Sequence, residues 1–376
     1  MREYLLVFLV AGVVSYLLCV FAREAAMRSG AVARVRDRDV HATPIPYFGG
    51  VAMLGGLGAG LLLAHRLPFL STAHFHDSGI VLIAGAMICA VGVIDDLIEL
   101  DALTKLGGQI VAAGFMVLND VQLWSLNLPG VGQLSLDPTQ AVLFSVLLVV
   151  GTMNAVNFVD GLDGLAGGVV LIGSVAFFLF SYKLADANGY TLAITAAMLC
   201  AAMGGACAGF LPHNFFPARI FMGDSGSMLL GLVLSGSALS LTGQFASVSV
   251  RSGGGDGSFV ILLPLLVPIT ILIVPLADLV LAVVRRTRRG QAFYQPDKEH
   301  LHHRLLEIGH SQRRAVLIMW LWAGLVAFGG VLVSLYSGRL IYEVLGALTL
   351  VTIGLTFVLP RIQPPEKLRS EPTVQH

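Results

Sequence analysis

Five aspartates in three separate segments are the residues most able to do chemistry in this chain. Their positions are Asp95, Asp96, Asp160, Asp163 and Asp224. If all five carboxylates meet on one face, they repel one another, and a divalent cation would relieve that repulsion. Carboxylate and amide oxygens suit Mg²⁺, with Mn²⁺ as a substitute, and Mg²⁺ often takes only one or two protein ligands plus substrate phosphates.

A fourth segment, residues 285–310, is rich in arginine and histidine. Its candidates for anion binding are Arg286, His300, His302 and His303. The arginines alone are typical of the cytoplasmic flank of a membrane span, but that reading does not explain three histidines within four residues. Histidine at this spacing can bind a transition metal or donate hydrogen bonds to phosphate oxygens. Carboxylates, a cation and a basic clamp together are the parts of a phosphoryl-transfer site.

The composition places these segments in an integral membrane protein. Of the 376 residues, 56% are hydrophobic and 12% are charged, about half the usual charged fraction of a soluble domain. The formal net charge is zero, which gives no indication of nucleic-acid binding. We therefore predict an all-α polytopic fold of about eleven transmembrane helices, with ten as the alternative. The apolar runs are 4–21, 48–64, 79–94, 106–118, 139–153, 164–182, 190–212, 225–245, 258–284, 315–336 and 340–360.

The positive charges predict the orientation of these helices. Most of the 23 lysine and arginine residues fall on one side if the N-terminus lies outside and the C-terminus lies in the cytoplasm. All four polar segments then lie at the cytoplasmic edge of the membrane. We predict a single transferase domain over residues 1–360 and a disordered cytoplasmic tail over 361–376.

Helical geometry divides the segment 154–168, NAVNFVDGLDGLAGG. Asn157 and Asp160 are neighbours on a continuous helix, whereas Asn154 and Asp163 face opposite ways. The two Asp-Gly pairs predict a helix break, after which Asp163 caps the next span. Asn154 is then expected to be structural. The segment MGDSGS (222–227) has two interpretations: it contributes a residue to the site, or it only provides the N-cap of the following span.

These motifs, in this order, resemble the polyprenyl-phosphate N-acetylhexosamine-1-phosphate transferases over nearly the whole chain. The matching segments are HATPIPYFGG, DD after the third run, NAVNFVDGLDGLAGG, NFFPARIFMGDSGS and PDKEHLHHRLLE. The motif NFFPARIFMGDSGS resembles the WecA/TagO branch of the family, which uses UDP-GlcNAc. The MraY branch, which uses UDP-MurNAc-pentapeptide, typically has consecutive histidines, and Leu301 interrupts them here. The segment RVRDRDVHATPIP resembles actinobacterial members, which implies decaprenyl rather than undecaprenyl phosphate as acceptor.

The resemblance implies a reaction in which UDP-GlcNAc and a polyprenyl phosphate give polyprenyl-diphosphate-GlcNAc and UMP, with Mg²⁺, at the start of a cell-envelope glycopolymer. The residues that it implies for binding and catalysis follow. Asp224 and Asn157 bind the metal. Asp95 is the general base, with Asp96 and Asp160 beside it in the catalytic site, and Lys105 contacts phosphate. The uracil pocket is lined by Gly161, Leu162 and Asp163, and Phe221 stacks on the uracil ring; Asn214 is a further active-site amide, and the diphosphate and sugar are held by Arg286, His300, His302 and His303.

Several alternatives stay open at this stage. A MraY-type phospho-MurNAc-pentapeptide transferase is the second enzyme reading, and a route through an aspartyl-phosphate is the mechanistic rival to direct transfer. A secondary transporter is disfavoured because transporter sites usually lie near the midplane. A scaffold would not need this set of Asp, Asn and His. A homodimer is an alternative to a monomer.

Overall fold

The computed structural model describes residues 1–33, 44–72, 75–128, 132–188, 191–242, 287, 305, 309–336 and 338–358. Ten α-helices are described in this part of the chain. Their bounds are α1 (Arg2–Ser29), α2 (Gly49–Ala64), α3 (Phe75–Ile98), α4 (Ala102–Leu118), α5 (Pro138–Val159), α6 (Leu165–Asn188), α7 (Thr191–Asn214), α8 (Gly223–Thr242), α12 (Gln312–Leu335) and α13 (Arg339–Phe357). A short 3₁₀ turn, η1 (Leu70–Thr72), follows α2.

The predicted all-α membrane fold is confirmed. Eight of the described helices are long and apolar enough to cross a membrane, and α2 and α4 are shorter apolar helices. Each described helix coincides with a predicted apolar run. The predicted run 258–284 and the predicted tail 361–376 lie outside the described residues.

Two helices begin earlier than their apolar runs because aspartates cap them. Asp101 accepts hydrogen bonds from the backbone N–H groups of Leu103 and Thr104, both at 3.0 Å, so α4 begins at Ala102. Asp137 forms a capping box with Gln140, and α5 begins at Pro138. The run 106–118 thereby becomes a helix of 17 residues, whereas α5 reaches 22 residues mainly because it continues beyond the C-terminal end of its run.

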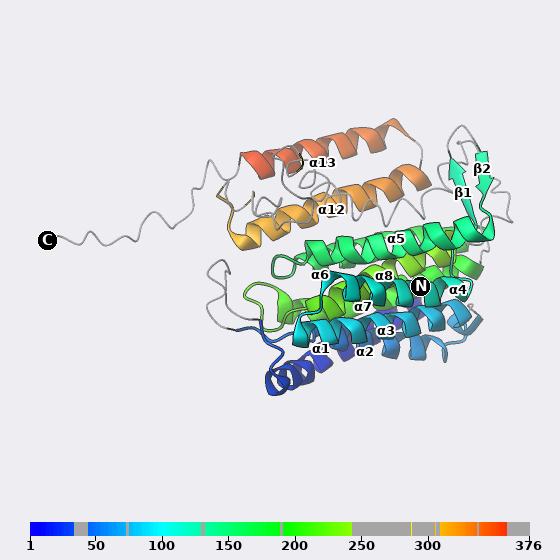
Figure 1. Ribbon diagram of the computed structural model, residues 1–376. Helices are drawn as coiled ribbons and strands as arrows, with labels where there is room; N and C mark the ends of the chain where they lie inside the picture. The colour runs from blue at the N-terminus through cyan, green and yellow to red at the C-terminus, as the bar shows by residue number, and fades with distance from the viewer. Residues whose placement is uncertain are drawn as a thin grey trace.

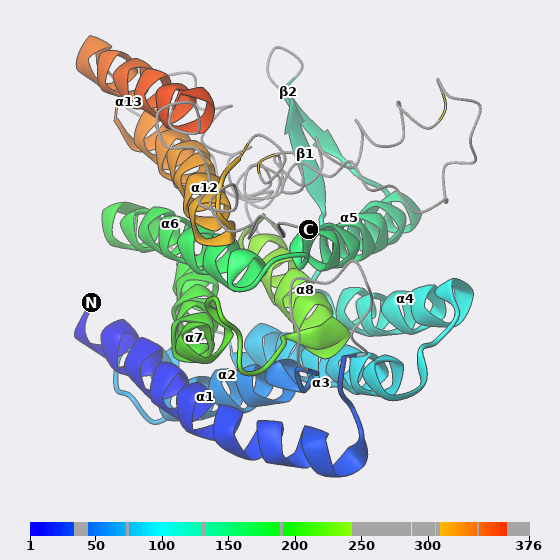
Figure 2. The ribbon, with the colours of Figure 1, turned by 90° about the vertical axis from the view of Figure 1, so that its left-hand side faces the viewer.

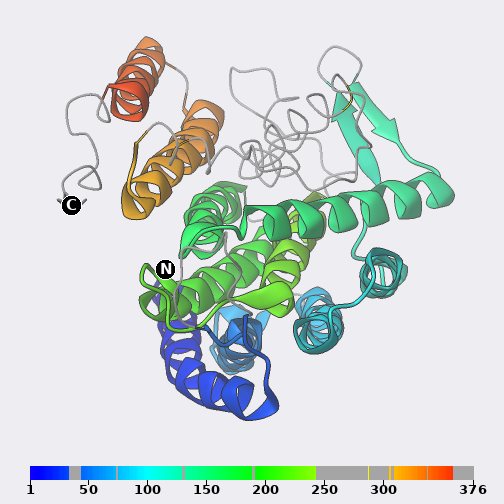
Figure 3. The same cartoon turned by 60° about the vertical axis from the view of Figure 1, so that its left-hand side comes forward.

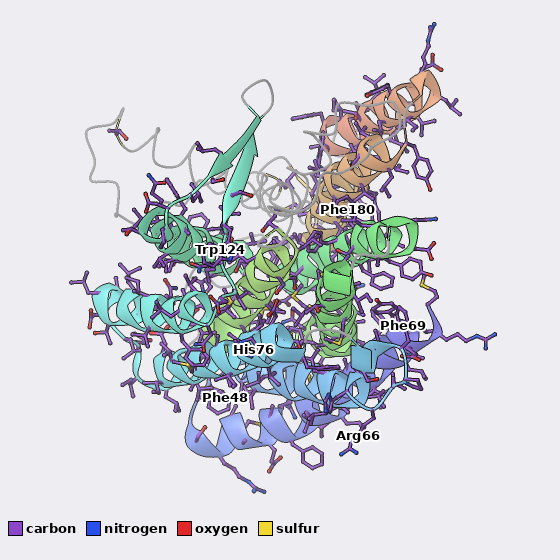
Figure 4. The ribbon with its side chains drawn as sticks, turned by 90° about the vertical axis from the view of Figure 1, so that its right-hand side faces the viewer. Phe48, Arg66, Phe69, His76, Trp124 and Phe180 are labelled. Carbon is purple, nitrogen blue, oxygen red and sulfur yellow. The ribbon has the colours of Figure 1, made fainter. Side chains whose placement is uncertain are left out.

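A β-hairpin departs from the purely helical prediction. Strands β1 (Ser125–Leu128) and β2 (Gly132–Ser135) pair in antiparallel fashion, with Ser125 opposite Ser135. The hairpin projects at the N-terminal end of α5 (Figures 1 and 3). Trp124 lies at its base beside α5 (Figure 4). Four-residue strands are too short to leave an alternating pattern that can be read from sequence.

The helices surround α8, which is the centre of the fold. It packs against α2, α3, α5 and α7, while α1 packs on α2 and α7 on the far side (Figure 2). The last two helices lie apart, with α12 on α6 and α13 on α12. Every residue of α8 except Asp224 is buried. The single partly exposed position on the central helix is therefore a carboxylate in its first turn.

The three polar segments that the structure describes meet at one end of this array, which faces the viewer in Figure 2. Helices α3, α5 and α7 end there, and α4, α6 and α8 begin there. The β-hairpin lies at the opposite end of α5. Which side of the membrane each end faces stays a prediction from the lysine and arginine distribution.

Candidate active site

Glycine lets α3 and α8 touch backbone to backbone at the site. A Cβ on Gly92 of α3 would overlap the backbone of Ser225 and lie 2.6 Å from the carbonyl carbon of Asp224. Gly223 has φ +68°, in the left-handed region, and its side-chain position is filled by the Asp96 carboxylate. These two glycines allow α3 to bring its last turn directly against the start of α8.

Asp96 uses that contact to cap α8 from another helix. Its carboxylate accepts hydrogen bonds from the backbone N–H of Asp224 at 2.9 Å and from the Ser225 hydroxyl at 2.9 Å, with the Ser225 N–H at 3.4 Å. These groups are among the N–H donors that a helix leaves unpaired at its start, and a negative charge there is favoured by the helix dipole. Asp96 therefore fixes the position of Asp224.

Asp95 points elsewhere, as expected for adjacent residues on a helix. Its Oδ1 accepts a hydrogen bond from the Leu100 backbone N–H at 2.7 Å, and its Oδ2 lies 3.2 Å from the Nζ of Lys105. The same ammonium forms an ion pair with Asp224 Oδ2. Lys105 is the first-turn residue of α4 that reaches both carboxylates, and its side chain is 20% exposed. The predicted neighbourhood of Asp95, Lys105 and Asp224 is present in the structure.

Asn157 completes the surroundings of Asp224. Its Nδ2 donates hydrogen bonds to Asp224 Oδ1 at 2.5 Å and to the Ser227 hydroxyl at 2.9 Å. Three helices thus converge on one carboxylate. We call Lys105 on α4, Asn157 on α5 and Asp224 on α8 the triad.

Two of the three triad side chains, Asp224 and Asn157, carry oxygen ligands of the kind that Mg²⁺ prefers when phosphates supply the remaining ligands, whereas the Lys105 ammonium does not ligate a cation. Asp224 has a carboxylate and Asn157 an amide, both oxygen-bearing, and Asp224 is reachable from outside. Within the described ranges, no group of three or more His, Cys, Asp or Glu is arranged to hold a metal alone. The residues fit a cation that is shared between the protein and a phosphate substrate, and do not form a closed structural metal site.

Asp160 lies one turn beyond Asn157 and ends α5. Its backbone N–H bonds the Asn157 carbonyl at 3.3 Å. Burial, with smaller contributions from the negative charges of Asp96 and Asp163, raises the pKa of Asp160 to about 7. The structure therefore places this carboxyl in the acidic neighbourhood that the sequence predicts.

The helix break predicted at the Asp-Gly pairs is present, and a second loop holds it in shape. Asn214, at the end of α7, accepts a hydrogen bond from Gly164 N–H at 2.9 Å and donates one to the Ile220 carbonyl at 3.0 Å. Asp163 is 5% exposed and accepts a hydrogen bond from Ala218 N–H at 3.0 Å. Both side chains link residues 160–164 to residues 214–222. The role of Asn214 as a further active-site amide stays a prediction.

The C-terminal helices support the same turn. A Cβ on Gly168 would overlap the indole of Trp320, which lies 5.6 Å from the Phe215 ring. The guanidinium carbon of Arg313 lies 5.5 Å from the centre of the Phe216 ring. Helix α12 thereby contacts both segments that the resemblance assigns to the uracil pocket.

The remaining predicted pocket residues differ in accessibility. Gly161 is exposed and Phe221 is half-buried, with its ring 6.0 Å from that of Tyr47. Leu162 is only 6% exposed and belongs to the apolar core. Four other predicted binding residues lie outside the described residues, namely Arg286, His300, His302 and His303.

Several residues at the site were not identified from the sequence. Ser225 and Ser227 bond Asp96 and Asn157, and Gly92 makes the helix contact possible. The GDSGS sequence suggested an N-cap, but the capping carboxylate comes from Asp96, 128 positions away. Sequence periodicity carries no signal for a cap supplied by another helix.

Chemically, the site combines a fixed carboxylate at a helix start, a lysine shared by two carboxylates and an amide donor. Helix N-termini and lysine ammonium groups both favour phosphate oxygens. The arrangement presents one partly exposed ammonium, beside a carboxylate and an amide, to a phosphate-bearing substrate.

Comparison with known proteins agrees with this chemistry. Residues 78–242 match the family model described as glycosyl transferase family 4. The chain is 45% identical to the decaprenyl-phosphate N-acetylglucosaminephosphotransferase of Mycobacterium tuberculosis, over 96% of this chain and 90% of the relative. It is 32% identical to a probable undecaprenyl-phosphate N-acetylglucosaminyl 1-phosphate transferase of Bacillus subtilis, over 85% and 82% of the two chains. It is 31% identical to the phospho-N-acetylmuramoyl-pentapeptide-transferase of Mycobacterium bovis, over 90% and 98%.

Proposed function

The chain belongs to glycosyl transferase family 4, and on that premise we propose that it transfers GlcNAc 1-phosphate from UDP-GlcNAc to a polyprenyl phosphate, releasing UMP. The observation that carries the proposal is the triad, in which one lysine, one amide and one carboxylate from three helices converge where phosphates can bind. The higher identity to the mycobacterial decaprenyl-phosphate enzyme supports GlcNAc as the sugar and decaprenyl phosphate as the acceptor. Undecaprenyl phosphate is the alternative acceptor.

The reaction is a single in-line displacement. An oxygen of the lipid phosphate forms a bond to the β-phosphorus of UDP-GlcNAc, and the bond from that phosphorus to the bridging oxygen breaks. The bridging oxygen leaves with UMP. Because a lipid phosphate is already largely ionised near neutral pH, little proton abstraction is needed, and positioning supplies most of the catalysis.

The described residues have distinct roles in this displacement. Lys105 binds the phosphate that attacks and neutralises part of its charge, since its partly exposed ammonium contacts both Asp95 and Asp224. Asp95 orients that ammonium. Asp96 holds Asp224 in place through the first turn of α8. Asn157 reaches the same carboxylate from α5.

Asp224 and Asn157 are the residues that would hold Mg²⁺. The bound ion would neutralise charge on the diphosphate and on the departing UMP. Mn²⁺ has similar ligand preferences and is expected to substitute.

The site is proposed to face the cytoplasm of a bacterial cell membrane. The two arguments are the concentration of lysine and arginine on that side and the cytoplasmic supply of nucleotide sugars. The apolar helices and the bacterial relatives support a multi-pass membrane location.

Membranes containing the chain, incubated with decaprenyl phosphate and Mg²⁺, test the proposal. UDP-GlcNAc, UDP-GalNAc and UDP-MurNAc-pentapeptide are offered separately, and UMP and the lipid product are measured. Product only with UDP-GlcNAc is the expected result, and product only with the pentapeptide donor would establish the second reading, which the 31% identity to the pentapeptide transferase keeps open. Membranes carrying Asp224→Ala are the control, and we expect them to lose turnover and its Mg²⁺ dependence together.

A further inference from the structure

A second layer of side chains lies one helical turn below the triad. Its members are Gln109 on α4, Asn154 on α5 and Met228 on α8. Gln109 follows Lys105 by four positions, and Met228 follows Asp224 by four. Asn154 precedes Asn157 by three positions. Because α4 and α8 begin at the site while α5 ends there, all three steps lead away from it, into the apolar part of the molecule.

Gln109 and Asn154 form a reciprocal amide pair. The Nδ2 of Asn154 donates to Gln109 Oε1 at 2.7 Å, and Gln109 Nε2 donates to Asn154 Oδ1 at 3.3 Å. Gln109 Nε2 also lies 3.2 Å from the sulfur of Met228, and Asn154 Nδ2 bonds the Val150 carbonyl at 2.8 Å. Gln109 is 1% exposed. Asn154 lies at an exposed position of α5, and all polar atoms of both side chains are engaged, as suits amides on membrane-spanning helices.

Helix α4 needs a directional contact because its apolar packing is one-sided. It packs on α3 and α5, while Leu103, Ile110 and Val111 are exposed on its outer face. A Cβ on Gly107 or Gly114 would meet nothing within 4 Å, whereas a Cβ on Gly108 would lie 2.8 Å from Val91, so this close contact of α4 is with α3. Apolar contacts of this kind resist separation but are weakly selective about sliding, whereas a two-bond amide pair is satisfied at only one register.

We propose that the Gln109–Asn154 pair sets the register of α4 against α5 and so positions Lys105 against Asp224. Gln109 and Asn154 are positioning residues and touch no substrate. The pair acts through Lys105, which sits one turn along the same helix face. The kinetic part of this inference rests on the proposed function, while its structural part does not.

The variant that tests the pair is Gln109→Leu, which keeps a side chain of similar length and removes the amide. Ser145→Ala is the matched control, because it removes a buried hydrogen bond of α5 to Leu123 N–H and lies at the opposite end of that helix. We expect Gln109→Leu to lower kcat by about tenfold or more, with KM for UDP-GlcNAc little changed. The exchanged variant Gln109→Asn with Asn154→Gln restores a reciprocal pair and is expected to recover part of the rate.

A double-mutant cycle separates positioning from general loss of stability. In a Lys105→Met background, Gln109→Leu is expected to cause no further loss, because the residue through which it acts is gone. Ser145→Ala is expected to have the same small effect in both backgrounds. Equal losses from Gln109→Leu with and without Lys105 would overturn the inference.

A distance measurement decides the structural part without any activity. Spin labels are attached at cysteines replacing the exposed residues Leu103 on α4 and Leu147 on α5, in a chain whose four buried cysteines are alanine. We expect the label-to-label distance distribution to broaden or shift in Gln109→Leu and to stay unchanged in Ser145→Ala. An unchanged distribution in Gln109→Leu would refute the register role. If the parent protein transfers no sugar phosphate, the proposed function fails, and this measurement still decides the inference.

Discussion

Lys105 and Asp224 form an ion pair that joins the first turn of α4 to the first turn of α8, although the two residues are 119 positions apart. The ammonium also lies 3.2 Å from Asp95. Both side chains are partly exposed, so this pair remains open to substrates. The positive charge of Lys105 therefore lies on the same carboxylate that is proposed to bind Mg²⁺.

Removal of Lys105 should strengthen divalent-cation binding while it slows turnover. Lys105→Met leaves Asp224 without its ammonium partner, and a competing charge at this distance is worth about 1 kcal/mol, roughly fivefold in affinity. Mn²⁺ binding to the substrate-free protein, followed by electron paramagnetic resonance, measures the first effect, and UMP release measures the second. Unchanged or weaker Mn²⁺ binding would contradict the competition between lysine and cation.

Asp95→Asn separates positioning from proton abstraction. The substituted side chain keeps an oxygen for the Leu100 N–H but loses the charge that holds Lys105. We expect kcat/KM to fall less than about tenfold at neutral pH, since a general base contributes about 10²–10⁴-fold. Rates measured from pH 6 to pH 9 check this, and a loss of about a thousandfold that is relieved at high pH would assign the base role to Asp95.

Asp96 is expected to act mainly on stability. Asp96→Ala leaves the Asp224 N–H and the Ser225 hydroxyl without their partner, at a cost of about 1–3 kcal/mol for buried polar groups. Thermal unfolding of the detergent-solubilised protein measures the loss. Asp96→Asn keeps one acceptor oxygen and should lie between the alanine variant and the wild type, whereas a destabilisation that is equal in both variants would argue against the cap.

Gly92→Ala should be strongly harmful although it adds one methyl group. The added Cβ overlaps the Ser225 backbone, so α3 and α8 must separate and the Asp96 cap must break. Gly79→Ala on the same helix is the control, because its Cβ would meet nothing within 4 Å. The measurement is the yield of folded protein by size-exclusion chromatography, together with UMP release. We expect Gly79→Ala to match or exceed the wild type in stability.

Asp160 should make stability depend on pH. The pKa of this carboxyl is raised to about 7 in the folded protein, from an ordinary value of about 4, so the folded state binds the proton more tightly than the unfolded state. Its contribution is therefore present below about pH 4 and is lost progressively as the pH rises through about 7. Asp160→Asn removes this titration. The unfolding temperature of the variant should exceed that of the wild type more at pH 8 than at pH 5, and an equal difference at both values would contradict the raised pKa.

The helices could be predicted from the sequence because apolar runs report burial directly. Their ends were predicted less well. The run 139–153 was ended before Asn154, yet α5 continues to Val159, and the polar Asn154 within it bonds Gln109 on another helix. The break at Asp160–Gly164 was predicted correctly, since Asp-Gly pairs act locally.

The composition of the site was more predictable than the function of each residue within it. The residue types correctly brought Asp95, Asp96, Asn157 and Asp224 together. They did not distinguish Asp96, which caps α8, from Asp95, which faces Lys105, because that difference depends on how α3 packs against α8. The roles of Gly92 and Trp320 likewise arise from contacts between segments far apart in the chain, which a single sequence does not encode locally.

The contact between Trp320 and Gly168 has a consequence for the order in which the chain is synthesised. A ribosome completes residues 154–168 and the loop 214–222 long before it reaches α12, with a delay on the order of ten seconds or more at ordinary elongation rates. During that interval Gly168 is without its contact to the Trp320 indole, and the Phe216 ring is without its contact to the Arg313 guanidinium. The turn after α5 and the loop 214–222 therefore gain these two contacts only after α12 has been synthesised, so this side of the candidate site is completed at the close of translation rather than at its midpoint.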